Sequence, residues 1–217
     1  MGFDPLRRVL KAHIDFERIR AASPVELLIA ATDVATGRPR LFRRHELSVE
    51  AVLASACLPA FHRAIEIDGR AYWDGAFSAN PDIVTLACES PVRDTLIVQL
   101  SPAEKTGVPK AVADIAAQVN RITFNQPYLR DIALIRAAQE AGLGWFAGRS
   151  GRIGRLKRHR FHLIEAGRFT GPLALDTQSK PDSRLLAYLH SAGRSEAQKW
   201  LERNLSGVGR RSTADLK

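Results

Sequence analysis

Apolar runs of strand length alternate with segments of helical periodicity along most of this chain. Val25–Thr32 is almost continuously apolar and Thr95–Leu100 has the same character, which is typical of strands covered on both faces of a sheet. Arg160–Ile164 predicts a later strand. The alternation predicts an α/β protein with a mostly parallel sheet and helices packed against it.

Capping residues and prolines mark the ends of the expected helices. Ser48 can cap a helix that runs to Ala56 and stops before Pro59, because proline disfavours the helical conformation at the preceding residue. Pro109 is expected to open another helix that bends or ends at Pro127. Its apolar residues recur at the spacing of one buried face and are Val112, Ile115, Val119 and Ile122.

Two further helical regions are expected beyond Pro127. One follows directly and reaches Ala141, before Gly142. The other, Asp182–Leu205, predicts two helices with a break near Gly193, because glycine weakens a helix interior.

The composition is that of a globular protein, with 45% hydrophobic and 25% charged residues among 217. Thirty-two Lys and Arg against 23 Asp and Glu give a net charge of +9, which favours anionic partners such as phospholipid headgroups or nucleic acid. No apolar run approaches the roughly 20 residues that cross a bilayer. Because the N-terminus also lacks the apolar stretch of a secretory signal, we expect a cytoplasmic protein that can bind a membrane peripherally.

The basic excess is concentrated between Arg149 and Arg160. Gly151 and Gly154 argue against a regular helix there, so we expect a solvated connecting loop. A patch for anionic membranes is the first alternative, and nucleic-acid binding has the least support because no aromatic residue is interleaved with the arginines. The cations available for membrane contact are Arg149, Arg152, Arg155, Lys157, Arg158 and Arg160.

Cysteine and histidine spacing indicates neither a metal site nor a disulfide. Cys57 and Cys88 fit no zinc or disulfide spacing, so we expect two buried apolar residues. His159 and His162 are three apart on an expected strand, which directs them to opposite faces and disfavours a shared metal ion. We expect no cofactor.

The stretch Ala64–Pro81 carries the candidate chemistry. Asp68-Gly69 is a favoured two-residue turn between two short strands, and the returning strand presents Asp74 at its exit. Gly75 follows, which lets the backbone turn sharply and keeps bulk away from the carboxylate. A purely structural turn aspartate is the plain alternative, since Asp and Gly dominate turns.

Three ordered motifs resemble those of the bacterial patatin-like phospholipases, serine hydrolases that cleave acyl esters of lipids. They are a Thr-Asp-x-x-Thr-Gly element at Thr32 to Gly37, an Ala-Ser-x-x-x-Pro helix end at Ala54 to Pro59, and Asp74-Gly75-Ala76 followed by Asn80-Pro81. The resemblance covers about residues 1–100. It implies a three-layer α/β/α fold, of which this chain would hold the incomplete C-terminal portion.

The resemblance implies that Asp74 takes the hydroxyl proton of a nucleophilic serine as that serine attacks an ester carbonyl. The residues that support this motif would be Gly75, Ala76, Asn80 and Pro81. In the family the serine lies in Gly-x-Ser-x-Gly, downstream of a glycine-rich loop that binds the oxyanion. Neither element occurs in the 217 residues.

No serine of this chain has the required setting. Ser55 and Ser78 flank the motif but occupy no strand-to-helix elbow, while Gly148–Gly151 and Gly193–Ala197 lack the spacing or the final glycine. His62 is the one histidine near enough in sequence to weigh as a triad member. Since the resemblance implies no histidine, we interpret it as a loop residue.

We therefore expect a carboxylic-ester hydrolase acting on phospholipid or other lipid esters, with its Ser-Asp pair completed by polypeptide outside this sequence. The alternative is a non-catalytic lipid- or protein-binding remnant of that fold. The expected division is 1–142 for the C-terminal part of the catalytic domain, 143–159 for a basic connector, and 160–217 for a C-terminal strand and helices. An incomplete sheet would leave strands such as Val25–Thr32 at an open apolar edge.

Overall fold

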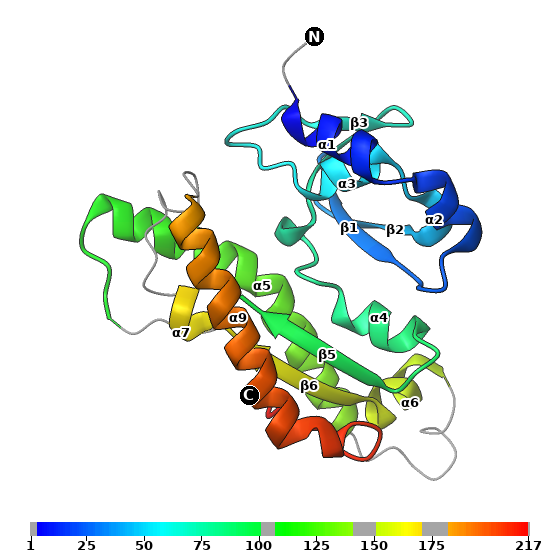
Figure 1. Cartoon of the computed structure of the whole chain (residues 1–217), viewed down its shortest axis with the longest axis vertical. Helices are drawn as coiled ribbons and strands as arrows, with labels where there is room; N and C mark the ends of the chain where they lie inside the picture. Colours follow the sequence, from blue (N-terminus) through cyan, green and yellow to red (C-terminus); the bar gives the residue numbers. More distant parts are fainter. Residues whose placement is uncertain (1–3, 101–106, 141–150, 171–181, 217) are drawn as a thin grey trace. The chain divides into compact units, whose positions relative to one another are not determined.

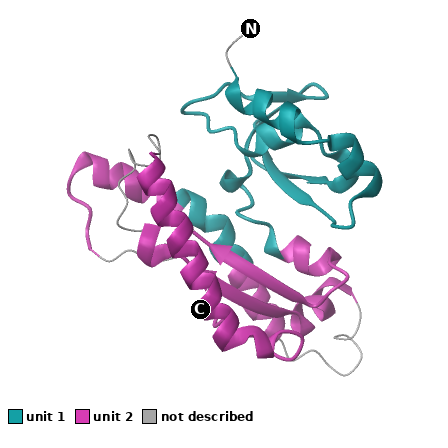
Figure 2. Ribbon diagram, viewed as in Figure 1, with its two compact units in different colours: residues 1–83, 123–131 teal, residues 84–122, 132–217 magenta. Residues whose placement is uncertain are grey.

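The computed structural model describes residues 4–100, 107–140, 151–170 and 182–216. The chain divides into two compact units, one of residues 1–83 and 123–131, the other of residues 84–122 and 132–217 (Figure 2). Each unit contains helices and its own sheet, so the predicted α/β class is confirmed. The predicted division into 1–142, 143–159 and 160–217 stays a prediction.

The first unit is built on a four-stranded sheet with the order β2-β1-β4-β3 (Figure 1). Its strands are β1 (Leu28–Asp33), β2 (Pro39–Arg43), β3 (Ile65–Ile67) and β4 (Arg70–Asp74). Every pairing is antiparallel, so the prediction of a mostly parallel sheet is wrong for this unit. The reason is local, because short turns join β1 to β2 and β3 to β4, and a tight hairpin can only return the chain antiparallel.

The predicted open edge at Val25–Thr32 is also wrong. The strand begins three residues later than expected, and β2 and β4 flank it on its two sides. The edge strands of this sheet are β2 and β3. The edge strand β2 carries Arg40 and Arg43, and charged side chains on an edge discourage pairing with other chains.

Three helices accompany this sheet: α1 (Pro5–His13), α2 (Phe16–Ala22) and α3 (Val49–Ser55). The hydroxyl of Ser48 accepts the N–H of Ala51 at 3.1 Å, so the predicted cap of α3 is confirmed. Helix α3 packs on β1, β3 and β4. The buried core between them consists of Ala31, Phe42, Leu47, Ala51, Ala54 and Tyr72.

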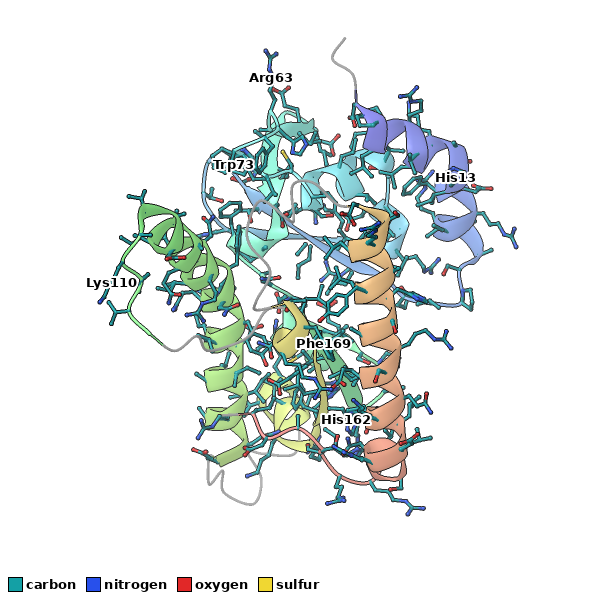
Figure 3. All side chains as sticks on the ribbon, turned by 60° about the vertical axis from the view of Figure 1, so that its left-hand side comes forward. His13, Arg63, Trp73, Lys110, His162 and Phe169 are labelled. Carbon is teal, nitrogen blue, oxygen red and sulfur yellow. The ribbon has the colours of Figure 1, made fainter. Side chains whose placement is uncertain are left out.

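The second unit centres on two parallel strands, β5 (Asp94–Gln99) and β6 (Arg160–Glu165), both close to their predicted positions. The chain reaches them through α4 (Ile83–Glu89). Within the described ranges this unit also contains α5 (Val112–Glu140) apart from residues 123–131, which belong to the first unit, together with α6 (Gly151–Arg158), α7 (Gly167–Thr170) and α9 (Ser183–Asn204). Helix α9 packs on β6, where the Trp200 ring meets the ring of His162, labelled in Figure 3, at 5.8 Å.

The β5–β6 pair leaves apolar residues of β5 exposed. Leu96 lies beside His162 in the register, so both are on the face that Trp200 of α9 covers. There His162 is buried, yet Leu96 and Val98 keep 45% and 60% of their surface exposed. Helix α9 therefore covers the β6 half of this face and leaves the β5 half open.

The expected loop at 149–160 is wrong for residues 151–158, which form α6. Tertiary contacts outweigh the low helix propensity of its glycines. Leu156 is 3% exposed, and the Arg155 guanidinium donates to the carbonyl of Cys88 at 2.8 Å, which ties the helix to the end of α4. Arg149 and the rest of 143–150 lie outside the described residues.

Helix α5 continues through Pro127, so the predicted end or bend that would separate two helices is wrong. Proline has no N–H for the carbonyl four residues back and loosens that turn. At the neighbouring position, the amide of Asn80 donates to the Phe124 carbonyl at 2.9 Å. The expected buried face of this helix is also wrong, since Val112, Ile115, Val119 and Ile122 are all exposed. The expected end at Ala141 lies outside the described residues.

Helix α9 runs unbroken past Gly193, contrary to the predicted break. Nothing lies within 4 Å of the place where a side chain at Gly193 would begin, and its φ is not in the left-handed region. The glycine is thus an ordinary helical residue, and tertiary contacts through Ala192 and Trp200 keep the helix continuous.

A carboxylate at the start of β5 holds the C-terminal segment against the parallel strands. Asp94 accepts two hydrogen bonds from the Arg160 guanidinium, at 2.9 and 2.6 Å, and one from the N–H of Gly209 at 2.9 Å. His162 Nε2 lies 3.1 Å from the same carboxylate, and its Nδ1 lies 2.8 Å from the hydroxyl of Thr213. These bonds lower the pKa of Asp94 far below its usual range, chiefly through Arg160.

Replacing Asp94 with asparagine is expected to lower the free energy of unfolding at pH 7 by about 1–3 kcal/mol, because the folded state loses the charge-assisted hydrogen bonds that this carboxylate accepts. Because the pKa of Asp94 is lower in the folded state than in the unfolded chain, its ionised form stabilises the fold fully at pH values above the unfolded pKa, near 4. This stabilisation is lost progressively as the pH falls from there towards the folded-state pKa. The deficit of Asp94→Asn should therefore shrink between pH 7 and pH 3.

Urea unfolding followed by circular dichroism at both pH values measures this effect. The matched control is Glu165→Gln, an exposed carboxylate at the end of β6, which should change stability by less than about 0.5 kcal/mol. A deficit of equal size at the two pH values would show that the charge of Asp94 does not carry the stabilisation.

Candidate active site around Asp74

The β3–β4 hairpin presents the candidate aspartate as the sequence predicts. Asp68 and Gly69 have φ of 51° and 74°, the left-handed values required at both central positions of a two-residue turn. Strand β4 then runs antiparallel to β3 and ends at Asp74, which pairs with Ala31 of the buried strand β1. The carboxylate is thus mounted on the sheet itself at the point where the chain leaves it.

The backbone and the side chain of Asp74 are both held. Its N–H donates to the carbonyl of Cys57 at 2.9 Å, and its Oδ1 accepts the N–H of Ala76 at 2.8 Å. The side chain thereby caps the single 3-10 turn η2 (Gly75–Phe77). Burial raises the pKa of Asp74, and the hydrogen bond from Ala76 offsets only part of that rise. A carboxylate in such a setting holds a proton more readily than an ordinary aspartate.

Gly75 is required by its closeness to β1. A Cβ at this position would lie 2.3 Å from the carbonyl oxygen of Ala30, far inside contact distance, and the two nearest obstructing atoms are backbone. Its φ lies outside the left-handed region. The glycine therefore allows the turn after Asp74 to pass directly over the strand.

Two hydroxyl groups join β1 to the turn at residues 74–78, called the Asp74 turn below. Thr32 Oγ1 donates to the backbone carbonyl of Asp74 at 2.7 Å and lies 2.8 Å from Ser78 Oγ. Because Thr32 has a single hydroxyl proton, the Ser78 hydroxyl is the donor in the second bond. Both side chains are buried, so the Asp74 turn is bonded to the strand at each end.

The loop after the Asp74 turn is fixed by α5. Asn80, whose peptide bond to Pro81 is cis, donates its side-chain amide to the Phe124 carbonyl. Three residues later, the N–H of Ile83 donates to the Asp131 carboxylate at 2.9 Å. Both partners on α5 belong to the same compact unit as Asp74. The Asn-Pro element thus contributes to the site by anchoring the chain that leaves it.

Aromatic rings line the same turn. Phe77 lies between Trp73, labelled in Figure 3, and Phe124, with ring centroids 6.5 and 5.0 Å away respectively. Trp73 directly precedes Asp74 on β4. In the register, Trp73 pairs with Thr32 whereas Asp74 pairs with Ala31, so the Trp73 ring and the Asp74 carboxylate lie on opposite faces of the sheet.

The other side chains considered as catalytic candidates are Ser55, Ser78 and His62. The hydroxyl of Ser55 donates to the Val52 carbonyl within its own helix, and Ser78 is buried in its bond to Thr32. His62 is exposed in the turn that follows α3. Asp33 accepts the N–H and hydroxyl of Thr36, and these bonds lower its pKa.

The buried positions of Cys57 and Cys88 confirm the expectation for both cysteines. Burial raises the pKa of the Cys57 thiol, and the charge of Asp74 adds to the rise. His159 and His162 are also buried, and His159 Nε2 lies 2.8 Å from the hydroxyl of Thr95. Within the described part of the chain, no group of three His, Cys, Asp or Glu side chains is placed to hold a metal ion.

The basic residues singled out in the sequence differ in their surroundings. Arg160 is engaged by Asp94 and Arg155 by the carbonyl of Cys88. Arg152, Lys157 and Arg158 are exposed on α6. Of the helices in the described ranges, none is long and apolar enough to cross a bilayer.

Comparison with known families adds one finding. The family model of the patatin-like phospholipases matches residues 1–87. This segment is patatin-like. It extends from the N-terminus into α4 and contains the whole Asp74 turn with Asn80 and Pro81. A search of curated proteins found no match.

Several residues that hold the Asp74 turn could not be found from local sequence. Thr32 stands in one of the recognised motifs, but nothing local indicates that its hydroxyl reaches Asp74, 42 positions away. Cys57 contributes its backbone carbonyl, which has no residue signature. Phe124 and Asp131 lie on α5, beyond the matched segment, and nothing in their spacing predicts a contact with the Asp74 turn.

Proposed function

We propose that this chain provides the carboxylate of a Ser-Asp pair that hydrolyses acyl esters of lipids, with Asp74 as the proton acceptor. The observation that carries the proposal is the Asp74 carboxylate itself, mounted at the end of β4, partly buried and raised in pKa. The match of residues 1–87 to the patatin-like phospholipases supports a lipid ester as the substrate. The serine comes from a segment with Gly-x-Ser-x-Gly, which these 217 residues lack.

In the proposed reaction, the serine hydroxyl attacks the ester carbonyl while its proton moves to the free oxygen of Asp74. The tetrahedral intermediate collapses, and the departing alcohol takes that proton back. Water then attacks the acyl-serine while Asp74 accepts a proton from it, and Asp74 returns this proton to the serine oxygen as the fatty acid leaves. Because Ala76 already donates to Oδ1, we assign the proton exchange to Oδ2.

Reconstitution tests this function. The chain is expressed behind its upstream coding region, or together with a patatin-like segment that carries the serine, and assayed with a short-chain nitrophenyl ester. We expect hydrolysis only when both parts are present, because nucleophile and oxyanion donors together supply most of the rate enhancement. Hydrolysis by the chain alone at the rate of the reconstituted protein would contradict the proposal.

A second candidate is a lipid- or protein-binding module that kept the fold and lost catalysis. The lack of Gly-x-Ser-x-Gly within the 217 residues favours it. The DNA upstream of Met1 separates the two candidates. An in-frame Gly-x-Ser-x-Gly within about a hundred codons supports the hydrolase, whereas a ribosome-binding site placed for Met1 without that motif supports the binding module.

Contact with an anionic membrane would bring such an enzyme to its substrate. Arg152, Lys157 and Arg158 on α6 are exposed, and Ile153 between them keeps 52% of its surface exposed. A cation near an anionic bilayer contributes about 1 kcal/mol, so three give a weak, salt-sensitive attachment.

We expect the chain to co-sediment with vesicles containing phosphatidylserine at low salt and to be released above about 0.5 M NaCl, where charges are screened within a few ångströms. The triple variant Arg152→Gln, Lys157→Gln, Arg158→Gln should lose this binding. The control variant Arg184→Gln on α9 removes an exposed cation elsewhere and should retain it. Equal binding to neutral and anionic vesicles would argue against the membrane contact.

A further inference from the structure

The hydroxyls of Thr32 and Ser78 form a short chain of hydrogen bonds that ends on the backbone of the candidate catalytic residue. Ser78 donates to Thr32, and Thr32 donates to the carbonyl of Asp74. Thr32 is only 5% exposed and Ser78 only 7%, so neither hydroxyl is satisfied by bulk water. Leaving a buried hydroxyl without a hydrogen-bond partner costs folding free energy, so the fold favours the arrangement in which both hydroxyls are bonded.

The peptide groups on both sides of Asp74 are fixed by these and neighbouring bonds. The N–H of Asp74 is held by Cys57, and its carbonyl is held by Thr32. The orientation of this carbonyl fixes the plane of the 74–75 peptide. That plane sets the direction in which the backbone continues through Gly75 and Ala76. The N–H of Ala76 then reaches Asp74 Oδ1.

We propose that Thr32 and Ser78 are positioning residues, which orient the Asp74 carboxylate by holding the backbone turn that follows it. This role rests on the proposed function for its catalytic consequence, but not for its structural content. If the Thr32 bond is removed, the 74–75 peptide gains freedom to rotate, and the Ala76 N–H no longer stays within reach of Oδ1. The carboxylate then samples several orientations and gains access to water.

The closeness of Gly75 to β1 explains why hydroxyl groups serve this purpose. The turn passes directly over the carbonyl of Ala30, which leaves no room for a larger side chain between strand and turn. Thr32 lies two residues further along the same strand, so its side chain is on the same face as Ala30. A short side chain with a donor and an acceptor can join both ends of the Asp74 turn from there.

Amide hydrogen exchange by NMR tests the proposal on this chain without any hydrolysis. Thr32→Val keeps the shape and removes the hydroxyl, Ser78→Ala removes the second member, and Thr32→Ser restores a hydroxyl at the first position. The matched control is Thr36→Val, whose exposed hydroxyl bonds to Asp33 rather than to the Asp74 turn. A ¹³C titration of the Asp74 carboxyl accompanies the exchange measurement.

We expect the Ala76 amide to exchange roughly tenfold faster in Thr32→Val, in line with the loss of one buried hydrogen bond, while Tyr72 in mid-strand keeps its rate. Burial is the main cause of the raised pKa of Asp74, so that pKa should fall towards its ordinary value. Thr32→Ser and Thr36→Val should both behave as the wild type. Ser78→Ala should change the same amide in the same direction.

An unchanged Ala76 amide in Thr32→Val and Ser78→Ala would overturn the proposal, as would equal acceleration at Ala76 and Tyr72, which indicates general loosening of the sheet. If Thr32→Val fails to fold, Ser78→Ala decides alone by the same two outcomes. In the reconstituted enzyme, the positioning role lowers kcat about tenfold with KM unchanged. Should Asp74 have no part in catalysis, the exchange result would stand while the kinetic effect disappeared.

Discussion

Asp74→Asn is expected to reduce kcat of the reconstituted hydrolase by roughly 10²–10⁴-fold, the usual contribution of a general base. Asparagine has nearly the same shape, and its oxygen can still accept the N–H of Ala76, so the Asp74 turn keeps its cap. Its amide cannot take the serine proton. The measurement is nitrophenyl-ester hydrolysis by the reconstituted protein with and without the substitution, at equal concentrations of folded protein.

The same substitution should stabilise the protein at neutral pH. Burial gives Asp74 a higher pKa in the folded state than in the unfolded chain, so the folded state favours the protonated form. The protonated Asp74 therefore contributes fully to stability below the unfolded pKa, and this contribution is lost as the pH rises through the folded-state pKa. Urea unfolding should therefore show a larger advantage of Asp74→Asn at pH 7 than at pH 3. Full activity combined with unchanged stability would remove Asp74 from the proposed mechanism.

Gly75→Ala is expected to cost about 3 kcal/mol of unfolding free energy, at the upper end of the range for overpacked sites. The added Cβ would fall 2.3 Å from the Ala30 carbonyl oxygen and 2.6 Å from its carbon, and neither backbone atom can move without distorting β1. Thermal unfolding monitored by circular dichroism measures the loss. A reconstituted Gly75→Ala enzyme should also lose most of its activity, because the turn that carries the carboxylate is displaced.

The control for this prediction is Gly193→Ala. No atom lies within 4 Å of the added Cβ, and the site is a helix interior, where alanine is favoured over glycine by about 0.5–1 kcal/mol. The two substitutions add the same methyl group and should change stability in opposite directions. A destabilisation of less than about 1 kcal/mol at Gly75 would mean that the turn can lift away from β1, and the tight packing would have no role in the site.

Features governed by neighbouring residues were predictable from the sequence. The Asp68-Gly69 hairpin depends on two adjacent residues that accept positive φ, and the cap of α3 depends on Ser48 and an N–H three residues later. The β5 strand follows from an apolar run of the right length. Local chemistry alone decides each of these features, so the sequence contains what is needed.

Features governed by distant contacts were predicted wrongly. Gly154 and Pro127 both argue against a helix. Nevertheless α6 forms, with Arg155 bonded to the Cys88 carbonyl, and α5 continues through Pro127, with Asn80 bonded to the Phe124 carbonyl. The exposed stripe of α5 shows the same limit, since spacing indicates an apolar face but not what covers it. Asp74 was recognisable because its motif is contiguous. The contact of Thr32 with Asp74 spans 42 residues and could not be recognised from the sequence.

The discontinuous first unit sets an order for assembly as the chain is made. The patatin-like segment ends at residue 87, but Phe124 and Asp131, which hold Asn80 and Ile83, are synthesised some forty residues later. Until then these two bonds to α5 cannot form, and the Asp74 turn is held by its hydroxyl bonds to β1 and by the bond from the Asp74 N–H to the Cys57 carbonyl. A protein that ended soon after residue 87 would retain every recognisable motif. It would lack the two hydrogen bonds to α5 that hold the chain after the Asp74 turn.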